Sequence, residues 1–454
     1  MTDVPRLVIS APSSGHGKTA VAVGLLAALT ARELSASAFK IGPDYADAAY
    51  LGMACGKTGR NLDPRLTSHS LVPDLFVHGS AGSDIAVVEG ALGLYDGISG
   101  VAGSQTTAQL AQHLRAPVVL VVDAALTGQS VAALVHGFKT YDSLVWLAGV
   151  ILTRVASDRH EEVLRQALDR IDVPVLGALR KSDLVSLPPR HHGMVPTADR
   201  APEAVRAVRR LGETILDTVD IDRLLSMARS APRLSATPWD PADVLATAGH
   251  TPRPGPKPLV AVAGGSFFTY SYTENIELLQ AAGADIAVVD PLRDTKLPDG
   301  AQGLVFGGGF PEWYVEELAG NVDMERDMAA LANAGAPIAA ESAGLVWLAE
   351  ELDGRPMGAV LAAAAKSTDQ TVLGYRDATA YSTSVLMRAG ETITGHQHHR
   401  TVVSPRAGDH PAWSWLGGRT EGYVERGVHA SYLNLNWAAL PVMASRFVGR
   451  VLRS

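Results

Sequence analysis

Residues 6–19 read RLVISAPSSGHGKT, a short apolar run followed by a loop of glycine and serine that ends in GKT. The Ala-rich segment 20–32 comes directly after it and has helical character. A strand–loop–helix of this kind binds phosphate, because successive backbone N–H groups can surround phosphate oxygens at the positive end of the helix. The stretch therefore predicts a nucleotide-binding P-loop at the start of an α/β domain.

The predicted P-loop departs from the GxxxxGK[ST] pattern at Pro12, which replaces the first glycine. Gly15 and Gly17 retain the backbone freedom that close approach to phosphate requires. Lys18 would reach the β- and γ-phosphates, and Thr19 would ligate Mg²⁺. The predicted nucleotide contacts are Ser14, Gly15, His16, Gly17, Lys18 and Thr19. A Gly/Ser-rich turn that ends in GKT by coincidence is the alternative.

Apolar runs alternate with helix-like segments on both sides of a proline-rich stretch. Before it, 85–88, 117–122 and 149–152 are predicted strands and 130–141 a helix; after it, 259–263, 285–290 and 303–306 are predicted strands, with a helix near 274–282. Such alternation favours parallel, doubly wound α/β sheets. Pro252, Pro254, Pro256 and Pro258 favour extended chain. We predict a P-loop domain at 1–235, a Pro-rich linker at 236–257 and a second parallel-sheet domain at 258–454.

Composition limits the partners and the compartment. Lys and Arg number 39 against 47 acidic residues, and a net charge of −8 gives no support to nucleic acid or an anionic membrane as partner. This balance is global, so it does not exclude a local basic patch. No stretch approaches the ~18 consecutive apolar residues of a membrane span, and the N-terminus lacks a signal-peptide pattern. The single cysteine, Cys55, excludes an intrachain disulfide framework, and we predict a cytoplasmic protein.

Acidic residues follow two of the strand-like runs. KIGPDYAD (40–47) supplies Asp44, and VVEG (87–90) places Glu89 at the exit of a buried strand. The carboxyl ends of parallel strands converge on the ligand crevice, so Thr19, Asp44 and Glu89 could meet around one Mg²⁺. For any single acid here, a surface position or a helix cap is the alternative.

Long motifs along the chain resemble the cobyrinate/hydrogenobyrinate a,c-diamide synthase family. They include KIGPDYADAAY (40–50), VVEGALGLYDG (87–97), LPPRHHGMVP (187–196), GGGFPEWYVEELAGN (307–321) and SYLNLNWA (431–438). The family joins a dethiobiotin-synthetase-like ATP domain to a class I glutaminase domain. The resemblance implies that ATP phosphorylates a substrate carboxylate, and that ammonia then displaces phosphate to leave a carboxamide.

The resemblance also implies roles for residues of the first domain. The implied catalytic residues are Lys18, Asp44, Asp47, Glu89 and Asp96. Thr19, Asp44 and Glu89 would hold the metal, and Asp47 and Asp96 would steer the substrate and intermediate. The implied partners are ATP, Mg²⁺, a small carboxylic acid with a corrin-ring precursor as one candidate, and a second copy of the chain in a homodimer.

The second domain departs from the family at the positions that hydrolyse glutamine. The family reads A-E-C-G-G, whereas residues 340–344 read AESAG and place Ser342 at the nucleophile position. It also reads S-Y-L-H-L-H near the end, where this chain has Asn434 and Asn436. Serine needs a strong base partner, and asparagine cannot accept a proton as imidazole does. We interpret the domain as a naturally degenerate glutaminase, with an engineered Cys→Ser substitution as the alternative.

The leading hypothesis is an ATP- and Mg²⁺-dependent carboxylate-amine ligase that uses free ammonia or another amine. The acid could instead be an unrelated acid of specialised metabolism, and its own amine could close a ring. The second class is a non-catalytic nucleotide-binding partner of an active paralogue, against which the acidic residues of the first domain argue. His396 and His399 in GHQHH (395–399) are either substrate contacts or ordinary hydrogen-bonded histidines.

Overall fold

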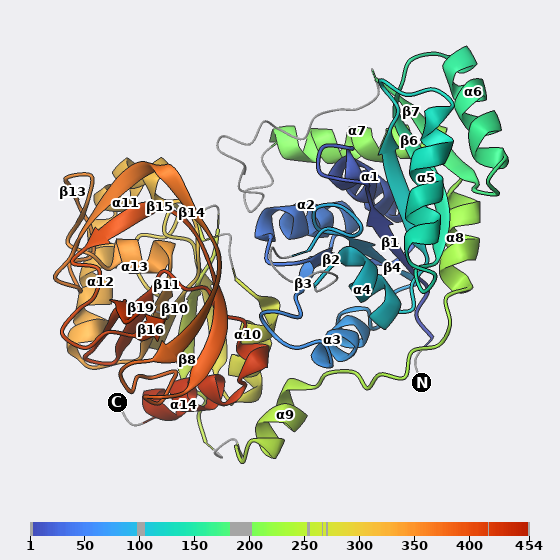
Figure 1. The fold of residues 1–454 in the computed structure, drawn as a ribbon. Coiled ribbons are helices and arrows are strands. Elements are labelled where there is room, and N and C mark those ends of the chain that lie inside the picture. The colour runs from blue at the N-terminus through green and yellow to red at the C-terminus, as the bar shows by residue number, and fades with distance from the viewer. Residues whose placement is uncertain are drawn as a thin grey trace. The chain divides into compact units, whose positions relative to one another are not determined.

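The computed structural model describes residues 3–97, 105–181, 202–251, 255–265, 267–268, 271–415 and 417–452. The chain divides into two compact units, Met1–Trp239 and Asp240–Ser454, whose elements are labelled in Figure 1. Each unit has its own cluster of buried apolar side chains. Both units are built on a largely parallel sheet, which confirms the predicted fold class.

The first unit is built on a seven-stranded parallel sheet of order β3-β2-β4-β1-β5-β6-β7. Its strands are β1 (Arg6–Ser10), β2 (Ala36–Ile41), β3 (Arg60–Leu62), β4 (Ile85–Glu89), β5 (Val118–Asp123), β6 (Leu147–Val155) and β7 (Val175–Arg180). Its helices are α1 (Lys18–Ala31), α2 (Tyr45–Cys55), α3 (Leu71–Gly79), α4 (Thr107–His113), α5 (Ser130–Tyr141), α6 (Asp158–Asp169), α7 (Pro202–Thr218) and α8 (Ile221–Arg229). Strands that are buried on both faces read as continuous apolar runs, and for this reason the sequence predicted β1, β4, β5 and β6, whereas β2, β3 and β7 were not predicted.

Helices cover both faces of this sheet. Leu7 and Ile9 of β1 belong to the buried cluster that also contains side chains of α1, α2, α7 and α8. Figure 1 shows α4 and α5 on the other side of the strands. The chain moves from β1 outward through β2 to β3 and then returns through β4 to β5, so its direction reverses at β1 and β4. The carboxyl ends of these two strands therefore flank the place where such sheets bind their ligands.

The second unit carries two sheets. The first has the order β18-β19-β11-β10-β8-β9 and is parallel apart from β18; the second has the order β13-β12-β14-β16-β17, with β15 paired to β14. The strands are β8 (Leu259–Ala263), β9 (Asp285–Val289), β10 (Ala301–Phe306), β11 (Ile338–Glu341), β12 (Glu351–Leu352), β13 (Arg355–Pro356), β14 (Ala364–Ala380), β15 (Thr392–Ser404), β16 (Trp413–Trp415), β17 (Arg419–Glu421), β18 (Tyr423–Glu425) and β19 (Val428–Ser431). The helices are α9 (Pro241–Thr247), α10 (Thr273–Ala281), α11 (Val315–Gly320), α12 (Val322–Asn333), α13 (Ala343–Trp347) and α14 (Val442–Val451). The sequence interpretation missed the second sheet, because the long strand β14 is polar and largely exposed and presents no apolar run.

Residues 236–257, predicted as a Pro-rich linker, contain the helix α9. The Asp240 side chain accepts hydrogen bonds from the backbone N–H groups of Ala242 and Asp243, and Pro241 occupies the first helical turn. A proline at this position sacrifices no helical hydrogen bond, so here proline begins a helix rather than preventing one. Pro252 and Pro254 lie outside the described residues, as does the motif 187–196.

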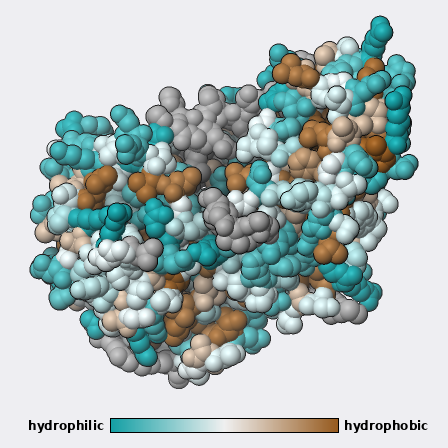
Figure 2. Space-filling model, viewed as in Figure 1, coloured by the Kyte–Doolittle hydropathy of each residue, from teal (hydrophilic) through white to brown (hydrophobic). Residues whose placement is uncertain are grey.

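The surface drawn in Figure 2 shows hydrophobic residues in separate patches among hydrophilic ones. In the first unit, large exposed apolar side chains include Leu126, Tyr141, Leu144 and Trp146. Within the described ranges, no helix is both long enough and apolar enough to span a bilayer.

Candidate active site

Strand register brings the P-loop and two strand-end residues of the first unit together. β1 pairs with β4 so that Ile9 lies opposite Glu89, and β2 pairs with β4 so that Lys40 lies opposite Glu89. The P-loop begins directly after β1, and α1 begins at Lys18. Lys40 and Glu89 are therefore held by the sheet beside the entrance to the P-loop.

The P-loop has the backbone conformation that phosphate binding requires. Gly15 and Gly17 have φ of 91° and 88°, in the left-handed region that favours glycine. A side chain built on Gly15 would meet no atom within 4 Å, so the space beside it is open. Pro12 packs against the loop that follows β4, since a Cβ on Gly93 would lie 2.4 Å from the Pro12 carbonyl oxygen. Pro12, which replaces the first glycine of the pattern, therefore lies where the P-loop contacts the loop after β4.

Two residues predicted as nucleotide contacts differ in their surroundings. His16 is held by two hydrogen bonds. Its Nδ1 accepts one from the Asp123 N–H at 2.8 Å, and its carbonyl oxygen accepts one from Thr153 Oγ1 at 2.9 Å. Burial lowers the pKa of His16. Ser14 is exposed at the tip of the loop. His16 therefore ties the loop to the ends of β5 and β6, which leaves its backbone rather than its ring for phosphate.

Lys18 is nearly buried, with 9% of its surface exposed. Its Nζ donates a hydrogen bond to the Leu92 carbonyl oxygen at 2.7 Å. Burial and repulsion from Lys40 lower the pKa of Lys18 to about 8. A phosphate group beside this ammonium would add to the negative charge of Glu89, Asp47 and Asp44 and favour the charged form of Lys18.

Thr19 and Glu89 form the centre of the site. Thr19 Oγ1 donates a hydrogen bond to Glu89 Oε1 at 2.6 Å, and Glu89 is fully buried. Glu89 Oε2 is also buried and has no hydrogen-bond partner among the described residues. Nowhere in the described part of the chain do three or more His, Cys, Asp or Glu side chains form a group that could hold a metal ion. One hydroxyl and one carboxylate with an unsatisfied oxygen nevertheless fit Mg²⁺, which takes its remaining ligands from phosphate and water.

Lys40 is a functional candidate that the sequence interpretation missed. Its Nζ lies 2.9 Å from Glu89 Oε1 and 2.7 Å from Asp47 Oδ2, and it donates to the Gly90 carbonyl oxygen at 3.1 Å. Burial opposes its charge, but the two carboxylates outweigh burial and raise the pKa of Lys40 above its usual value. A lysine inside the apolar run AFKI was the available signal, because a buried lysine requires acidic partners.

The remaining predicted acids occupy three different environments. Asp44 caps α2, where its side chain accepts hydrogen bonds from the backbone N–H groups of Ala46 and Asp47. Asp47 is buried and reaches Glu89 through Lys40. Asp96 is exposed and accepts a hydrogen bond from the Gly93 N–H at 3.0 Å, on the loop that packs against the P-loop. The structure joins Thr19 to Glu89 directly and Asp47 to Glu89 through Lys40, whereas Asp44 has the capping role that was the alternative interpretation.

In the second unit, the turn between β11 and α13 has a strained backbone at Ser342. Its φ and ψ are 47° and −99°, a conformation that residues other than glycine rarely adopt. The Ser342 N–H donates to the Ser431 carbonyl oxygen at 2.7 Å. The Ser342 Oγ is buried and has no hydrogen-bond partner in the described part of the chain. The turn is therefore shaped for a nucleophile, but no described side chain accepts its proton.

The two asparagines near the C-terminus are engaged elsewhere. Asn434 Nδ2 donates to the His396 carbonyl oxygen at 2.9 Å, and Asn434 Oδ1 is buried without a partner among the described residues. Asn436 Oδ1 accepts a hydrogen bond from the Ala438 N–H at the start of a 3₁₀ turn. Neither side chain hydrogen-bonds Ser342.

In GHQHH, His396 and His399 are buried and His398 is half-buried. His399 Nδ1 pairs with the Thr401 carbonyl oxygen at 2.8 Å, and its ring stacks on Tyr432 at a centroid distance of 3.7 Å. Burial lowers the pKa of His399 to about 4. His396 packs edge-on against Tyr375, and burial lowers its pKa to about 3, with His398 adding to the shift. Both rings are therefore neutral near pH 7, and His399 has the contacts of an ordinary structural histidine.

Two family models match the chain, one to each unit. Residues 7–194 match the CobQ/CobB/MinD/ParA nucleotide binding domain, and residues 260–439 match the CobB/CobQ-like glutamine amidotransferase domain. The class of protein is therefore a nucleotide-binding domain joined to an amidotransferase-type domain.

Relatives along the whole length define the family more closely. A hydrogenobyrinate a,c-diamide synthase of Streptomyces coelicolor is 52% identical and covers 98% of this chain and 97% of its own. A protein of the same name from Thermobifida fusca is 44% identical over 99% of this chain and 97% of its own. A cobyrinate a,c-diamide synthase of Synechococcus is 36% identical over 97% of both chains. The chain belongs to the cobyrinate/hydrogenobyrinate a,c-diamide synthase family, which confirms the resemblance seen in its motifs.

Proposed function

We propose that the chain is an ATP- and Mg²⁺-dependent ligase that converts carboxylates of a corrin-ring acid into carboxamides, with free ammonia or another amine as nitrogen donor. The printed names of the full-length relatives support the substrate class. The observation that carries the catalytic part is the buried group of Thr19, Lys40, Asp47 and Glu89 beside the P-loop.

The first step transfers the terminal phosphoryl group of ATP to the acid. The P-loop N–H groups and Lys18 would bind the phosphates. Mg²⁺, held by Thr19 and Glu89, would neutralise charge on the β- and γ-phosphates. A carboxylate oxygen of the substrate attacks the γ-phosphorus, the bond to ADP breaks, and an acyl phosphate results. Lys40 holds Asp47 and Glu89 in place. These three residues would contribute charge and positioning to the reaction and would form no covalent bond with the substrate.

The second step forms the amide. Ammonia attacks the acyl carbon, the bond from that carbon to the phosphate oxygen breaks, and nitrogen loses a proton to solvent. We propose that this ammonia does not come from glutamine within the second unit. The lack of a proton acceptor beside Ser342 in the described structure supports this, since a serine nucleophile requires one.

The test supplies the purified chain with MgATP and either hydrogenobyrinate or cobyrinate. We expect ADP release only with an acid, carboxamide formation with ammonium chloride, and no glutamate from glutamine. Lys18→Ala should abolish ADP release. Glutamate formation would contradict the ammonia-dependent mechanism. Turnover with a different acid alone would indicate non-corrin or ring-closing chemistry, and failure of every acid would favour a non-catalytic nucleotide-binding partner.

We further propose that the protein works in the cytoplasm as a homodimer, without nucleic-acid or membrane partners. The single cysteine and the net charge of −8 support the compartment and the lack of polyanionic partners. Light scattering should give twice the chain mass of 47.7 kDa. A molar mass of one chain at micromolar concentration would contradict the dimer.

A further inference from the structure

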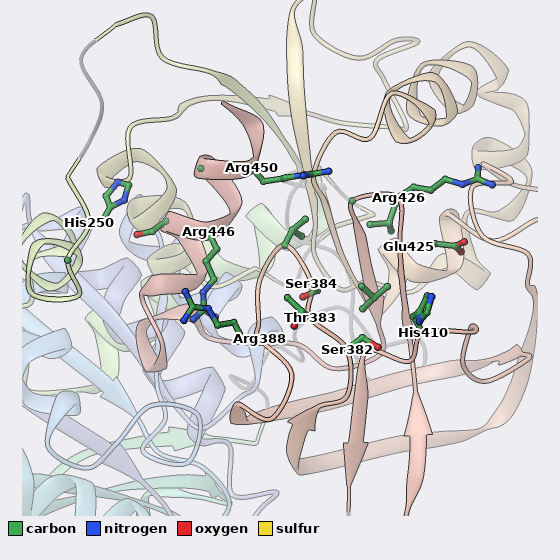
Figure 3. Close-up of a pocket in the computed structure, with 17 residues that line it drawn as sticks. His250, Ser382, Thr383, Ser384, Arg388, His410, Glu425, Arg426, Arg446 and Arg450 are labelled. Carbon is green, nitrogen blue, oxygen red and sulfur yellow. The ribbon is translucent and has the colours of Figure 1, made fainter. Parts of the chain in front are cut away.

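A basic cavity lies in the second unit, apart from the residues assigned above. Its volume is about 1110 Å³, and Figure 3 shows it between α14, the segment 382–388 and the turn at 425–428. Four arginines line it, at positions 388, 426, 446 and 450, together with His250 and His410. Of the residues that line it, Glu425 alone is acidic.

The cavity lies at the opposite end of the parallel sheet from Ser342. β19 runs parallel to β11, with Val428 opposite Ile338 and Ser431 opposite Glu341. Val428 lines the cavity at the start of β19, whereas Ser342 follows the end of β11. Val428 and Ser431 lie three residues apart on β19, which corresponds to about 10 Å along the strand. The cavity is therefore not part of the amidotransferase-type centre.

Arg446 is a fixed guanidinium in the lining. It forms a two-point ion pair with Glu391, at 2.5 Å from Nη1 to Oε2 and 2.6 Å from Nη2 to Oε1. Its Nε is buried, and so is the Oγ of the neighbouring Ser445; neither atom has a hydrogen-bond partner among the described residues. Both atoms are closed off from solvent, so neither faces the cavity directly, and Arg446 contributes a positive charge that the ion pair with Glu391 holds in place.

Arg388 and Arg450 add exposed positive charge to the lining. Both are exposed, and the described structure shows no ion pair or side-chain hydrogen bond for either. Even when Glu425 and the Glu391 paired to Arg446 are counted, four arginines leave two positive charges in excess. Such a concentration is notable in a chain of net charge −8.

We propose that this cavity binds a small polyanion, a molecule that carries at least two carboxylate or phosphate groups. Guanidinium groups match the geometry of both, because each can accept two parallel N–H hydrogen bonds. The volume is of the order of small-molecule sites, about 300–1,000 Å³. The hydroxyl-bearing residues Ser382 and Thr383 in the lining add further donors. A monovalent anion would leave one of the two excess charges unmatched.

Calorimetric titration of the full chain with tripolyphosphate and with tricarballylate tests the proposal and separates phosphate from carboxylate recognition. The Arg388→Ala/Arg450→Ala variant should bind the preferred anion at least about tenfold more weakly, since it loses two charge-assisted contacts. The matched control is Arg326→Ala/Arg355→Ala, which removes the same charge from two exposed arginines of the same unit that pair with Asp323 and Glu316. Lys18→Ala removes P-loop binding from the measurement.

Binding that survives Lys18→Ala and the control pair, but weakens in the Arg388/Arg450 variant, supports the proposal for whichever anion shows it. The proposal is overturned if neither anion binds, if the control pair weakens binding equally, or if Lys18→Ala abolishes binding altogether. Urea midpoints of the two double-arginine variants should match that of the parent chain, because every substituted arginine is exposed.

Discussion

Ser342 has the positive φ of a nucleophile turn, but no described side chain accepts a hydrogen bond from its hydroxyl. A positive φ at a non-glycine residue costs roughly 1–3 kcal/mol and persists only when the surrounding structure enforces it. Here the enforcing contacts are the hydrogen bond to Ser431 and the complete burial of Ala343 and Gly344. The geometry for attack is therefore present, and what differs from the family is chemistry at two or three side chains.

If the second unit does not hydrolyse glutamine, as proposed above, introducing the cysteine and histidine of the family motifs should give it that activity. We expect Ser342→Cys with Asn434→His to release glutamate from glutamine about 10²–10⁴ times faster than Ser342→Cys alone, the contribution typical of a positioned general base. Ser342→Cys with Asn436→His is the matched control, because it adds a histidine two residues away. A coupled glutamate assay measures the rates. No gain in either double variant would contradict the hypothesis that these side chains are what prevents glutamine hydrolysis.

Lys18 should take up a proton when nucleotide binds. With a pKa of about 8 in the free protein, Lys18 is largely neutral at pH 8.5. Bound phosphates raise this pKa, so binding of MgATP at pH 8.5 should take up most of one proton. Calorimetry in two buffers of different ionisation enthalpy measures the uptake. Lys18→Arg is the control, because arginine is already charged; equal uptake in that variant would place the proton elsewhere.

At the scale of single elements, α2 depends on Asp44 for its first turn. Asparagine caps helices as well as aspartate does, whereas alanine costs about 1 kcal/mol. Asp44→Asn should therefore keep the unfolding free energy and, if the carboxylate also serves Mg²⁺ or catalysis as the sequence predicts, lower turnover at least about tenfold. Asp44→Ala should lower both the unfolding free energy and the turnover. Asp220→Ala, at the cap of α8, is the matched control and should lose stability alone. Full activity of Asp44→Asn would leave Asp44 with only the capping role.

Elements differed in how well the sequence predicted them. The strand at 259–263 and the helix at 130–141 have the predicted bounds, because each is a run whose local pattern matches its burial. The hairpin of β14 and β15 and the helix α9 were not predicted. The hairpin strand β14 is mostly polar, with only three of its 17 residues buried, and α9 begins at a proline in a segment otherwise rich in helix breakers.

At the scale of the whole molecule, stability should depend on pH through buried carboxyl groups. Burial raises the pKa of Glu421 to about 7. The stability that its protonated form contributes is therefore fully present below pH ~4.5 and is lost as pH rises through about 7. Between pH 5 and 8 the unfolding free energy of the parent chain should fall by roughly 3 kcal/mol relative to Glu421→Gln.

Urea unfolding at several pH values measures this difference. Glu391→Gln is the control of opposite sign, because the hydrogen bond from Arg446 lowers the pKa of Glu391. The advantage of the parent chain over that variant is present above pH ~4.5 and is lost as pH falls below it. A pH-independent difference between the parent chain and Glu421→Gln would contradict the burial argument.

The sequence by itself determined the P-loop, the alternation of strands and helices and the family, because these depend on residue types within a few positions of one another. Only the tertiary structure decided that Lys40 bridges Asp47 and Glu89, that Asp44 caps a helix, and that Ser342 has no described proton acceptor. The arginines of the basic cavity likewise lie at positions spread from 388 to 450. Such juxtapositions arise from strand register and packing between distant segments, which no local pattern in the chain encodes.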